Sequence, residues 1–304
     1  MLQILLIVAL TLEIALYIFL GVYWWDGIGS LFMIAPLIIG LAVMVRILFV
    51  LPSYGLSAVL RFRNNNRQPW GNSFYALDKE LDARVVAFGW SEAFHQRVMP
   101  ERISNAISRI DPTPILLVHG YLSNRGIFWQ LRKRLFAADL GPIYALNLEP
   151  LMGSIDNMVP TLAEHIEKIC SETNAAQITV VAHSMGGLVT RRYMSLQANG
   201  GFRIKRFITL GSPHHGTEMA RFSVGKCVAE MRTASAWLSA LESAEVATEK
   251  PPTLSIYTLN DDLVYPPESS KLYWAENVPM AAVGHISLLF SKPVAERVIA
   301  EIKK

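Results

Sequence analysis

Ser184 stands in the stretch Ala182–Gly186 (AHSMG), between an apolar β-branched run and a segment with helical spacing. This is the spacing of a nucleophile elbow, small-x-Ser-x-Gly, in which a sharp turn from strand to helix leaves the serine hydroxyl exposed. The turn is so tight that the positions on either side must be small, and the N-terminal end of the helix favours negative charge that develops at the serine. Ser184 is therefore the predicted nucleophile.

A serine nucleophile needs a histidine as general base and an acid that orients the histidine. In proteins with a nucleophile elbow, the three residues follow in the chain order Ser, Asp or Glu, His. After Ser184 the sequence holds three histidines, His214, His215 and His285. His214 and His215 end an earlier strand-like run, where they are expected to shape the pocket wall or the turn. His285 follows the last strand-like run, in a loop placed to carry it over the sheet, and is the predicted base.

The acid is expected in the segment 254–270, where Asp261 and Asp262 both stand at the end of a strand-like run. Only one of the two can face His285. Asp261 is preferred because the apolar side chain of Val264 would tuck back under the loop, and Asp262 remains the alternative. The aspartate that does not face the histidine is expected to cap or solvate the turn. Three glutamates are less well placed: Glu242, Glu245 and Glu268.

Ester cleavage by a serine also needs two backbone N–H groups that hold the oxyanion. Met185, directly after the nucleophile, is expected to supply one, and Tyr121, in the loop after residues 115–120 (ILLVHG), the other. Gly120 lets the backbone approach closely there. His119 precedes the serine and ends a different strand, so it is expected to orient this loop and not to act as the base.

From residue 115 onwards, short apolar runs alternate with amphipathic segments. The predicted strands are 115–120, 143–148, 178–183, 206–211, 254–259 and 279–284. The predicted helices lie near 127–138, 157–171, 187–197, 228–241 and 293–302. Such alternation predicts an α/β fold, with a mostly parallel sheet covered by helices on both faces. The chemistry of such a sheet gathers beyond the carboxyl ends of its strands, where the polar motifs above fall.

Two apolar runs, 2–20 and 31–51, are each long enough to cross a hydrocarbon core of about 30 Å as a helix. A cleaved signal peptide is the alternative for the first run, but it has no basic n-region and no cleavage site, and a second apolar run follows. Residues 1–51 are therefore predicted to form a transmembrane hairpin. Glu13, inside the first run, must be protonated or paired with a neighbour, and a role in helix packing is expected.

The charges around the hairpin predict its orientation. The loop between the spans carries Asp26 and no Lys or Arg, whereas Arg61, Arg63 and Arg67 follow the second span. By the positive-inside rule, both ends of the hairpin lie in the cytoplasm. The basic cluster is expected to contact anionic headgroups beside the membrane.

The rest of the chain is predicted to have two parts. Residues 52–110 form a polar juxtamembrane linker up to residue 71 and a largely helical segment over 74–109, and residues 111–304 form the catalytic domain. The net charge of +3 is too small and too scattered for a nucleic-acid partner. The sequence shows no cluster of metal ligands and no phosphate-binding glycine loop, so no metal and no cofactor is expected.

The motifs around the candidate residues resemble those of bacterial triacylglycerol lipases and esterases of the α/β-hydrolase fold. The resemblance covers residues 114–304 and rests on PILLVHGY, VVAHSMGGLVTRRY and FITLGSPHHGT, followed by the aspartate loop and the Gly-His loop. It implies a catalytic triad and two oxyanion donors, which are Ser184, Asp261 and His285 with Tyr121 and Met185. It does not account for the predicted hairpin, which most secreted members lack.

The sequence leaves oligomeric state and acyl-chain length open, and it predicts either a partial lid or a packed surface helix over residues 218–250. The favoured function is a membrane-anchored serine hydrolase that cleaves a lipid or another acyl ester. Its expected place is the bacterial inner membrane, with the catalytic domain facing the cytoplasm. An acyltransferase or a thioesterase with the same triad is the alternative. A non-catalytic binding protein is a third hypothesis, which the retained triad disfavours.

Overall fold

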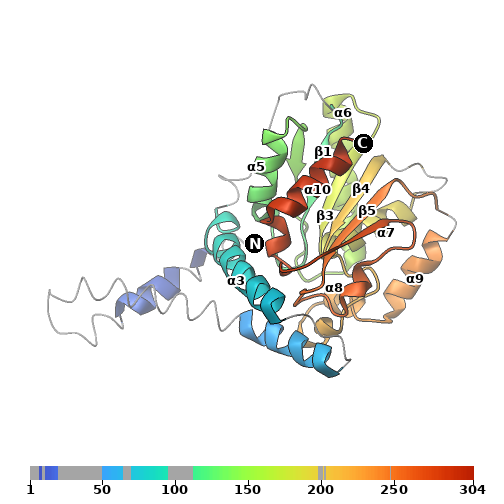
Figure 1. The fold of residues 1–304 in the computed structure, drawn as a ribbon. Coiled ribbons are helices and arrows are strands. Elements are labelled where there is room, and N and C mark those ends of the chain that lie inside the picture. Colours follow the sequence, from blue (N-terminus) through green and yellow to red (C-terminus); the bar gives the residue numbers. More distant parts are fainter. Residues whose placement is uncertain are drawn as a thin grey trace.

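The structure is a computed structural model that describes residues 7–8, 11–19, 50–63, 70–94, 112–197, 201, 203–246 and 248–304. Within these residues six parallel strands form one sheet, in the order β2-β1-β3-β4-β5-β6 (Figure 1). Their bounds are β1 Ile115–Val118, β2 Ile143–Ala145, β3 Ile178–His183, β4 Ile204–Leu210, β5 Thr253–Thr258 and β6 Glu276–Met280. Because β3 pairs with β1 and β4, the residue after β3 stands near the centre of the carboxyl edge.

The strands form where the sequence has short apolar runs. Every residue of β1, β2, β3 and β5 is buried, and β4 is buried except at Lys205. A parallel sheet covered on both faces is built from such continuous apolar runs, and β-branched side chains fit its pleated surface. The predicted parallel α/β architecture is confirmed by this sheet.

Helices cover both faces of the sheet (Figure 1). On one face lie α6 (Ile155–Thr173), α7 (Met185–Ser195), α8 (Lys226–Glu230) and α9 (Ala236–Glu245). On the other lie α3 (Trp70–Val86), α5 (Trp129–Ala137) and α10 (Lys292–Ile302). Successive side chains of a strand point to opposite faces, so β1 contributes Leu116 and Val118 to the first core and Ile115 and Leu117 to the second.

The longest of these helices, α6, shows how the sequence sets an element's ends. Its N-cap is Ser154, whose side chain accepts a hydrogen bond from the N–H of Asp156, and its C-cap is Asn174 in the left-handed conformation. Between them the apolar side chains recur at helical spacing on one face, which is buried against the sheet.

Three predicted elements differ from the structure. The last strand is β6 at Glu276–Met280 and not 279–284. Residues 281–284 therefore form a loop, which ends directly before His285. The predicted helix 228–241 is two helices, α8 and α9, because Ser235 caps a new helix with its side chain on the N–H of Leu238. Residues 52–63 are helical where a polar linker is predicted.

The chain before α3 is described only in part. Of the predicted spans, residues 7–8, 11–19 and 50–51 are described, and the remainder of the hairpin lies outside the described residues. No helix within the described ranges combines the length and the apolar character needed to cross a bilayer. In the first run Tyr17 Oη donates to Glu13 Oε1 at 2.5 Å, so Glu13 is paired with a neighbour.

The helical segment predicted over 74–109 is α3 followed by a π-helix at Ala87–Ser91. Residues 95–111 lie outside the described residues.

Candidate active site

Ser184 lies between the end of β3 and the start of α7, at the carboxyl edge of the sheet. Its backbone has a φ of 55° and a ψ of −129°, a conformation that L residues rarely adopt and that costs about 1–3 kcal/mol. Its N–H donates to the carbonyl of Leu210 at 2.9 Å, which ties the turn to β4. A Cβ on Gly186 would lie 2.5 Å from the carbonyl oxygen of Val118, so this position has room only for glycine.

His285 and Asp261 meet at the same edge of the sheet, from the loops that follow β6 and β5. His285 Nδ1 lies 2.9 Å from Asp261 Oδ2, and both side chains are buried. The carboxylate accepts the Nδ1 hydrogen, which leaves the lone pair of the ring on Nε2. Asp261 Oδ1 accepts from the N–H groups of Leu263 at 2.9 Å and Val264 at 2.7 Å. Val264 is buried, and it lines the cavity.

The environment of His285 favours its charged form. Burial lowers the pKa of His285, but Asp261, followed by Asp262 and Glu80, outweighs burial, and the pKa is raised above its ordinary value. The neighbouring His183 has its ring 4.7 Å away, and burial and His285 hold the pKa of His183 well below its ordinary value. The neutral His183 donates from Nε2 to the carbonyl of His285 at 3.2 Å. Because His183 occupies the variable position of the elbow motif, its sequence position alone gave no sign of this contact.

Asp262 points away from His285, toward the helices that precede the sheet. Its Oδ2 accepts from Arg84 Nη2 at 2.5 Å and from Ser53 Oγ at 2.5 Å. The side chain of Asp262 is fully buried. The alternative acid is therefore not the partner of His285, and it is an ion-paired buried group instead of a solvated turn residue.

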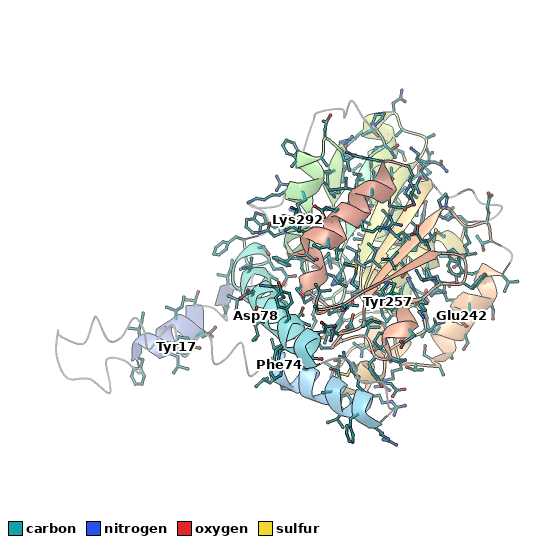
Figure 2. All side chains as sticks on the ribbon, viewed as in Figure 1. Tyr17, Phe74, Asp78, Glu242, Tyr257 and Lys292 are labelled. Carbon is teal, nitrogen blue, oxygen red and sulfur yellow. The ribbon has the colours of Figure 1, made fainter. Side chains whose placement is uncertain are left out.

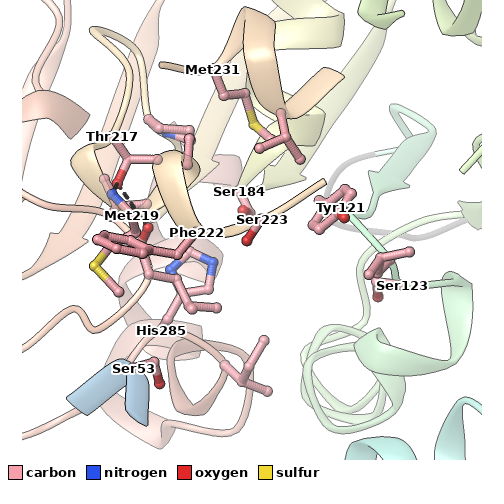
Figure 3. Close-up of a pocket in the computed structure, with 18 of the residues that line it drawn as sticks. Ser53, Tyr121, Ser123, Ser184, Thr217, Met219, Phe222, Ser223, Met231 and His285 are labelled. Carbon is pink, nitrogen blue, oxygen red and sulfur yellow. Dashed lines mark hydrogen bonds between the residues drawn. The ribbon is translucent and has the colours of Figure 1, made fainter. Parts of the chain in front are cut away.

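The loop after β1 carries Tyr121. The Tyr121 hydroxyl donates to the carbonyl of Val224 at 2.6 Å, and Tyr121 lines the same cavity as Ser184 and His285 (Figure 3). Met185 is the first residue of α7, where a helix leaves its own N–H groups unpaired. The role of the backbone N–H groups of Tyr121 and Met185 as oxyanion donors stays a prediction.

His119 orients the loop that carries Tyr121. Its Nε2 accepts from the N–H of Leu148 at 2.9 Å, and its Nδ1 donates to the carbonyl of Gly120 at 2.9 Å. Both ring nitrogens are therefore engaged with backbone groups, one directly after β1 and one in the segment after β2, as expected of an orienting residue. His119 is buried.

A second contact holds the same loop from the N-terminal side. Glu92, directly after the π-helix, accepts from the N–H of Asn124 at 3.1 Å and from the hydroxyl of Ser123, and its own carbonyl accepts from Asn124 Nδ2 at 3.0 Å. Burial raises the pKa of the Glu92 carboxyl to about 8. The sequence gave no sign of this contact, because the partners are 31 and 32 positions apart.

His214 and His215 do not line the cavity. His214 is buried, with Nε2 against the hydroxyl of Thr209 at 3.1 Å. His215 is exposed, with Nδ1 2.9 Å from Glu242 Oε1. Both belong to the turn after β4, so of the two predicted roles, pocket wall or turn, the second applies.

A cavity of about 670 Å³ opens over Ser184 (Figure 3). Its walls come from the helix at 50–63, from α3 and the π-helix, and from the segment after β4. Its apolar lining includes Pro52, Leu56, Phe88, Met219, Val228 and Met231. No acidic side chain is among its described lining residues, and its one arginine, Arg84, is held by two carboxylates.

The segment 218–250 has two parts with different attachments. The 3-10 helix Glu218–Phe222 and α8 contribute to the cavity wall. The following helix, α9, is tied to α7 by a buried ion pair, in which Arg191 Nε and Nη2 donate to Glu245 at 3.0 and 2.5 Å. Within this segment α9 is therefore packed against α7, whereas the first part lines the cavity.

The chain belongs to the family whose model is described as a domain of unknown function (DUF7379), which matches residues 82–251. The match includes Tyr121, Ser184 and Met185, and it ends before Asp261 and His285.

Solved lipases have a similar architecture. Lipase B of Aspergillus fumigatus is similar with a TM-score of 0.57 and 17% identity, over 63% of this chain and 52% of that one. The mature form of the Bacillus licheniformis lipase BlEst2 is similar with a TM-score of 0.56 and 15% identity, over 68% of this chain and 96% of that one. The chain thus spans about half of the Aspergillus protein. These similarities show the fold, which is the parallel-sheet α/β fold of lipase-type α/β-hydrolases, as predicted.

Proposed function

We propose that this member of the family is a serine hydrolase that cleaves carboxylic esters of the lipid type. One observation carries the proposal. His285, whose Nδ1 lies 2.9 Å from Asp261 Oδ2, lines the same cavity as Ser184, which occupies a strained turn at the head of α7. A serine, a buried carboxylate and a histidine in this order along the chain constitute the arrangement that activates a hydroxyl for acyl transfer.

The proposed reaction has two halves. In the first, Ser184 Oγ attacks the ester carbonyl carbon and passes its proton to Nε2 of His285, while the N–H groups of Tyr121 and Met185 hold the oxyanion. The tetrahedral intermediate expels the alcohol, which takes the proton from His285. In the second half, water loses a proton to His285 and attacks the acyl-enzyme, which frees the acid and restores Ser184. Asp261 stabilises the imidazolium throughout.

The lining of the cavity supports an apolar acyl ester as substrate. The described walls are mostly apolar and hold no acidic side chain, and the charge of Arg84 is neutralised locally. A volume of about 670 Å³ is in the range that accommodates a drug-sized ligand. Three of the lining residues, Pro52, Ser53 and Leu56, come directly after the predicted second span.

We further propose that residues 1–51 anchor the enzyme in a membrane with its catalytic domain on the cytoplasmic side. The support is the pair of apolar runs, 2–20 and 31–51, and the charges that flank them. Anchoring raises the effective concentration of a lipid substrate at the cavity. A reporter fused after Lys304 should report a cytoplasmic location, and an exported signal would reverse the orientation.

The decisive experiment combines a fluorophosphonate probe with ester hydrolysis by the full-length chain in membranes. The probe should label Ser184, and Ser184→Ala and His285→Ala should each lower kcat by at least about a thousandfold. Free acid as the product favours hydrolysis, and acylated alcohol or thiol favours the transferase alternative. Unlabelled Ser184 in a folded protein, or activity in Ser184→Ala near that of the wild type, would remove the hydrolase proposal.

A further inference from the structure

The loop that carries His285 is held from its far side by a carboxylate of α3. Glu80 Oε1 accepts from the N–H of Ile286 at 3.0 Å, and Glu80 Oε2 accepts from the N–H of Ser287 at 2.8 Å. The Glu80 side chain is fully buried. Because the two oxygens of one buried side chain each hold a backbone N–H group, the loop is fixed at two successive residues relative to α3.

Arg84 joins this contact to the loop that carries the acid. Its Nε donates to Glu80 Oε1 at 2.9 Å, and its Nη2 donates to Asp262 Oδ2 at 2.5 Å. Arg84 has 11% of its side chain exposed, while both carboxylates are fully buried. One guanidinium therefore connects the residues after His285 to the residue after Asp261.

The helix at 50–63 completes the connection. Ser53 Oγ donates to Asp262 Oδ2 at 2.5 Å, and Arg61 Nη2 donates to the carbonyl of Asp261 at 2.5 Å. Arg61 is buried, and so it is not available to the lipid headgroups that its basic cluster predicts. Ser53 and His285 line the same cavity (Figure 3).

The glycine before the histidine is explained by the same helices. A Cβ on Gly284 would lie 2.5 Å from Glu80 Oε2 and 2.5 Å from the hydroxyl of Tyr54. A side chain at this position would push α3 and the helix at 50–63 away from the loop. The Gly-His pair of the sequence is thus matched to helices about 200 residues earlier in the chain.

We propose that Glu80 and Arg84 are positioning residues, which hold the His285 loop and the Asp261 loop at the separation that the hydrogen bond between His285 and Asp261 needs. The inference rests on the proposed function, and it makes α3 a part of the active site and not a spacer between membrane and enzyme. Displacing a catalytic group by about 1 Å can lower the rate by a factor of about a hundred. Substrate binding depends mainly on the other cavity walls, so the loss falls on kcat.

A purely structural role predicts something else. If Glu80 only stabilises the fold, its variants contain fewer active molecules, and each active molecule turns over at the normal rate. The two roles are separated by counting active sites through complete fluorophosphonate labelling and dividing the ester turnover by that count. The pseudo-first-order rate of labelling is a second measure of the activation of Ser184.

The test uses Glu80→Gln in the full-length chain in detergent micelles, with a p-nitrophenyl ester as substrate. Glutamine keeps the shape but replaces one acceptor by a donor, so one of the two N–H groups loses its partner. We expect kcat for each labelled site to fall at least tenfold, with KM within threefold of the wild type and with slower labelling. The matched control is Asp78→Asn on the same helix, with a side chain that is 66% exposed (Figure 2), which should behave as the wild type.

If Glu80→Gln yields no labelled sites, Arg84→Lys decides the question. Lysine keeps the charge but cannot reproduce the two-sided contact of the guanidinium, and kcat for each site should fall at least threefold. A kcat within twofold of the wild type in every variant that folds would overturn the inference. That result leaves the proposed function standing, whereas hydrolysis that survives Ser184→Ala removes the function itself.

Discussion

Two buried carboxylates, Asp261 and Glu80, hold the loop of His285 in different ways. Asp261 accepts two backbone N–H groups from its own loop, two and three residues ahead, and its other oxygen faces the histidine. Glu80 also accepts two backbone N–H groups, but from a loop 206 and 207 residues later in the chain. The ring of His285 is thus oriented from one side, and the backbone that follows it is held from the other.

The difference between these two regions is one of distance along the chain. The region of Asp261 is self-contained, because the loop after β5 orders its own acid before it meets the histidine. In the region of Glu80, Arg84 is the one local partner of the carboxylate among the residues that the structure describes. The remaining partners of these buried charges come from the loops after β5 and β6, so they are in place only when α3 is packed against the sheet. A buried charge without its partner is costly, so the packing of α3 and the order of the His285 loop are expected to depend on one another.

The largest expected effect is on kcat, in a comparison of variants of the two adjacent aspartates. Asp261→Asn keeps the shape but removes the charge that holds the His285 tautomer, and kcat should fall by about ten thousandfold. Asp262→Asn leaves the contact with His285 intact, and its loss should stay below about a hundredfold. Steady-state hydrolysis of a p-nitrophenyl ester measures both. Equal losses would mean that the two regions are not separable, and a larger loss in Asp262→Asn would reassign the acid.

How much could be predicted from the sequence follows from the same contrast. The nucleophile turn depends on Ala182, Ser184 and Gly186, which are close together in the chain. The choice of Asp261 came from Val264, three residues on. These predictions rest on local geometry, and the structure places the predicted side chains together at one edge of the sheet.

The remainder depended on contacts between distant segments. Pro52 to Gly71 is polar enough to be taken for a linker, yet part of it is a helix whose Ser53 and Arg61 bind the acid loop. Glu80 and Arg84 look like an ordinary i,i+4 surface pair in a helix of mixed charge. Their burial is decided by the later chain, so no local pattern distinguishes them from Asp78 and Asp82, which are exposed on the same helix.

The next effect concerns stability. Arg84→Met removes the cation between Glu80 and Asp262 and leaves two buried carboxylates unpaired, so the free energy of unfolding should fall by about 3–5 kcal/mol. The control is Arg192→Met, whose ion pair with Asp156 has side chains 26% and 45% exposed and which should cost at most about 1 kcal/mol. Urea denaturation followed by tryptophan fluorescence gives both values. If the free energy of unfolding falls by the same amount in both variants, the buried ion pairs around α3 contribute no more to stability than an exposed ion pair does.

A smaller and pH-dependent effect is expected at Glu92. Burial raises the pKa of its carboxyl from 4.5 to about 8, so the folded state binds a proton more tightly than the unfolded state. The stabilisation from that proton is complete below pH 4.5 and is lost as the pH rises to about 8, because the unfolded state releases the proton first. Glu92→Gln should flatten this decline in denaturation curves recorded between pH 5 and pH 8. A decline as steep as that of the wild type would assign it to other groups.

The smallest effect is a shift in the pH profile, which measures how strongly the two regions act on the same ring. The base must be neutral, so kcat/KM rises with pH as His285 loses its proton. Because the pKa of His285 is raised above its ordinary value, this rising limb of the profile is expected above pH 6.5. Three acidic groups act on the ring and raise the pKa of His285: Asp261 by direct contact, and Asp262 and Glu80 through their charges. The ring of the neutral His183 lies beside it.

Removing one of these charges should therefore move the limb in a known direction. Asp262→Asn takes away a negative charge from the side of α3, which lowers the pKa of His285 and moves the limb to lower pH. Glu242→Gln removes an equally negative charge from α9, where the side chain is 48% exposed and paired with His215 (Figure 2), and it should leave the limb in place. The profile of kcat/KM between pH 5 and pH 9 measures both. A limb that stays in place, or moves to higher pH, in Asp262→Asn would show that the region around α3 acts on His285 through geometry alone.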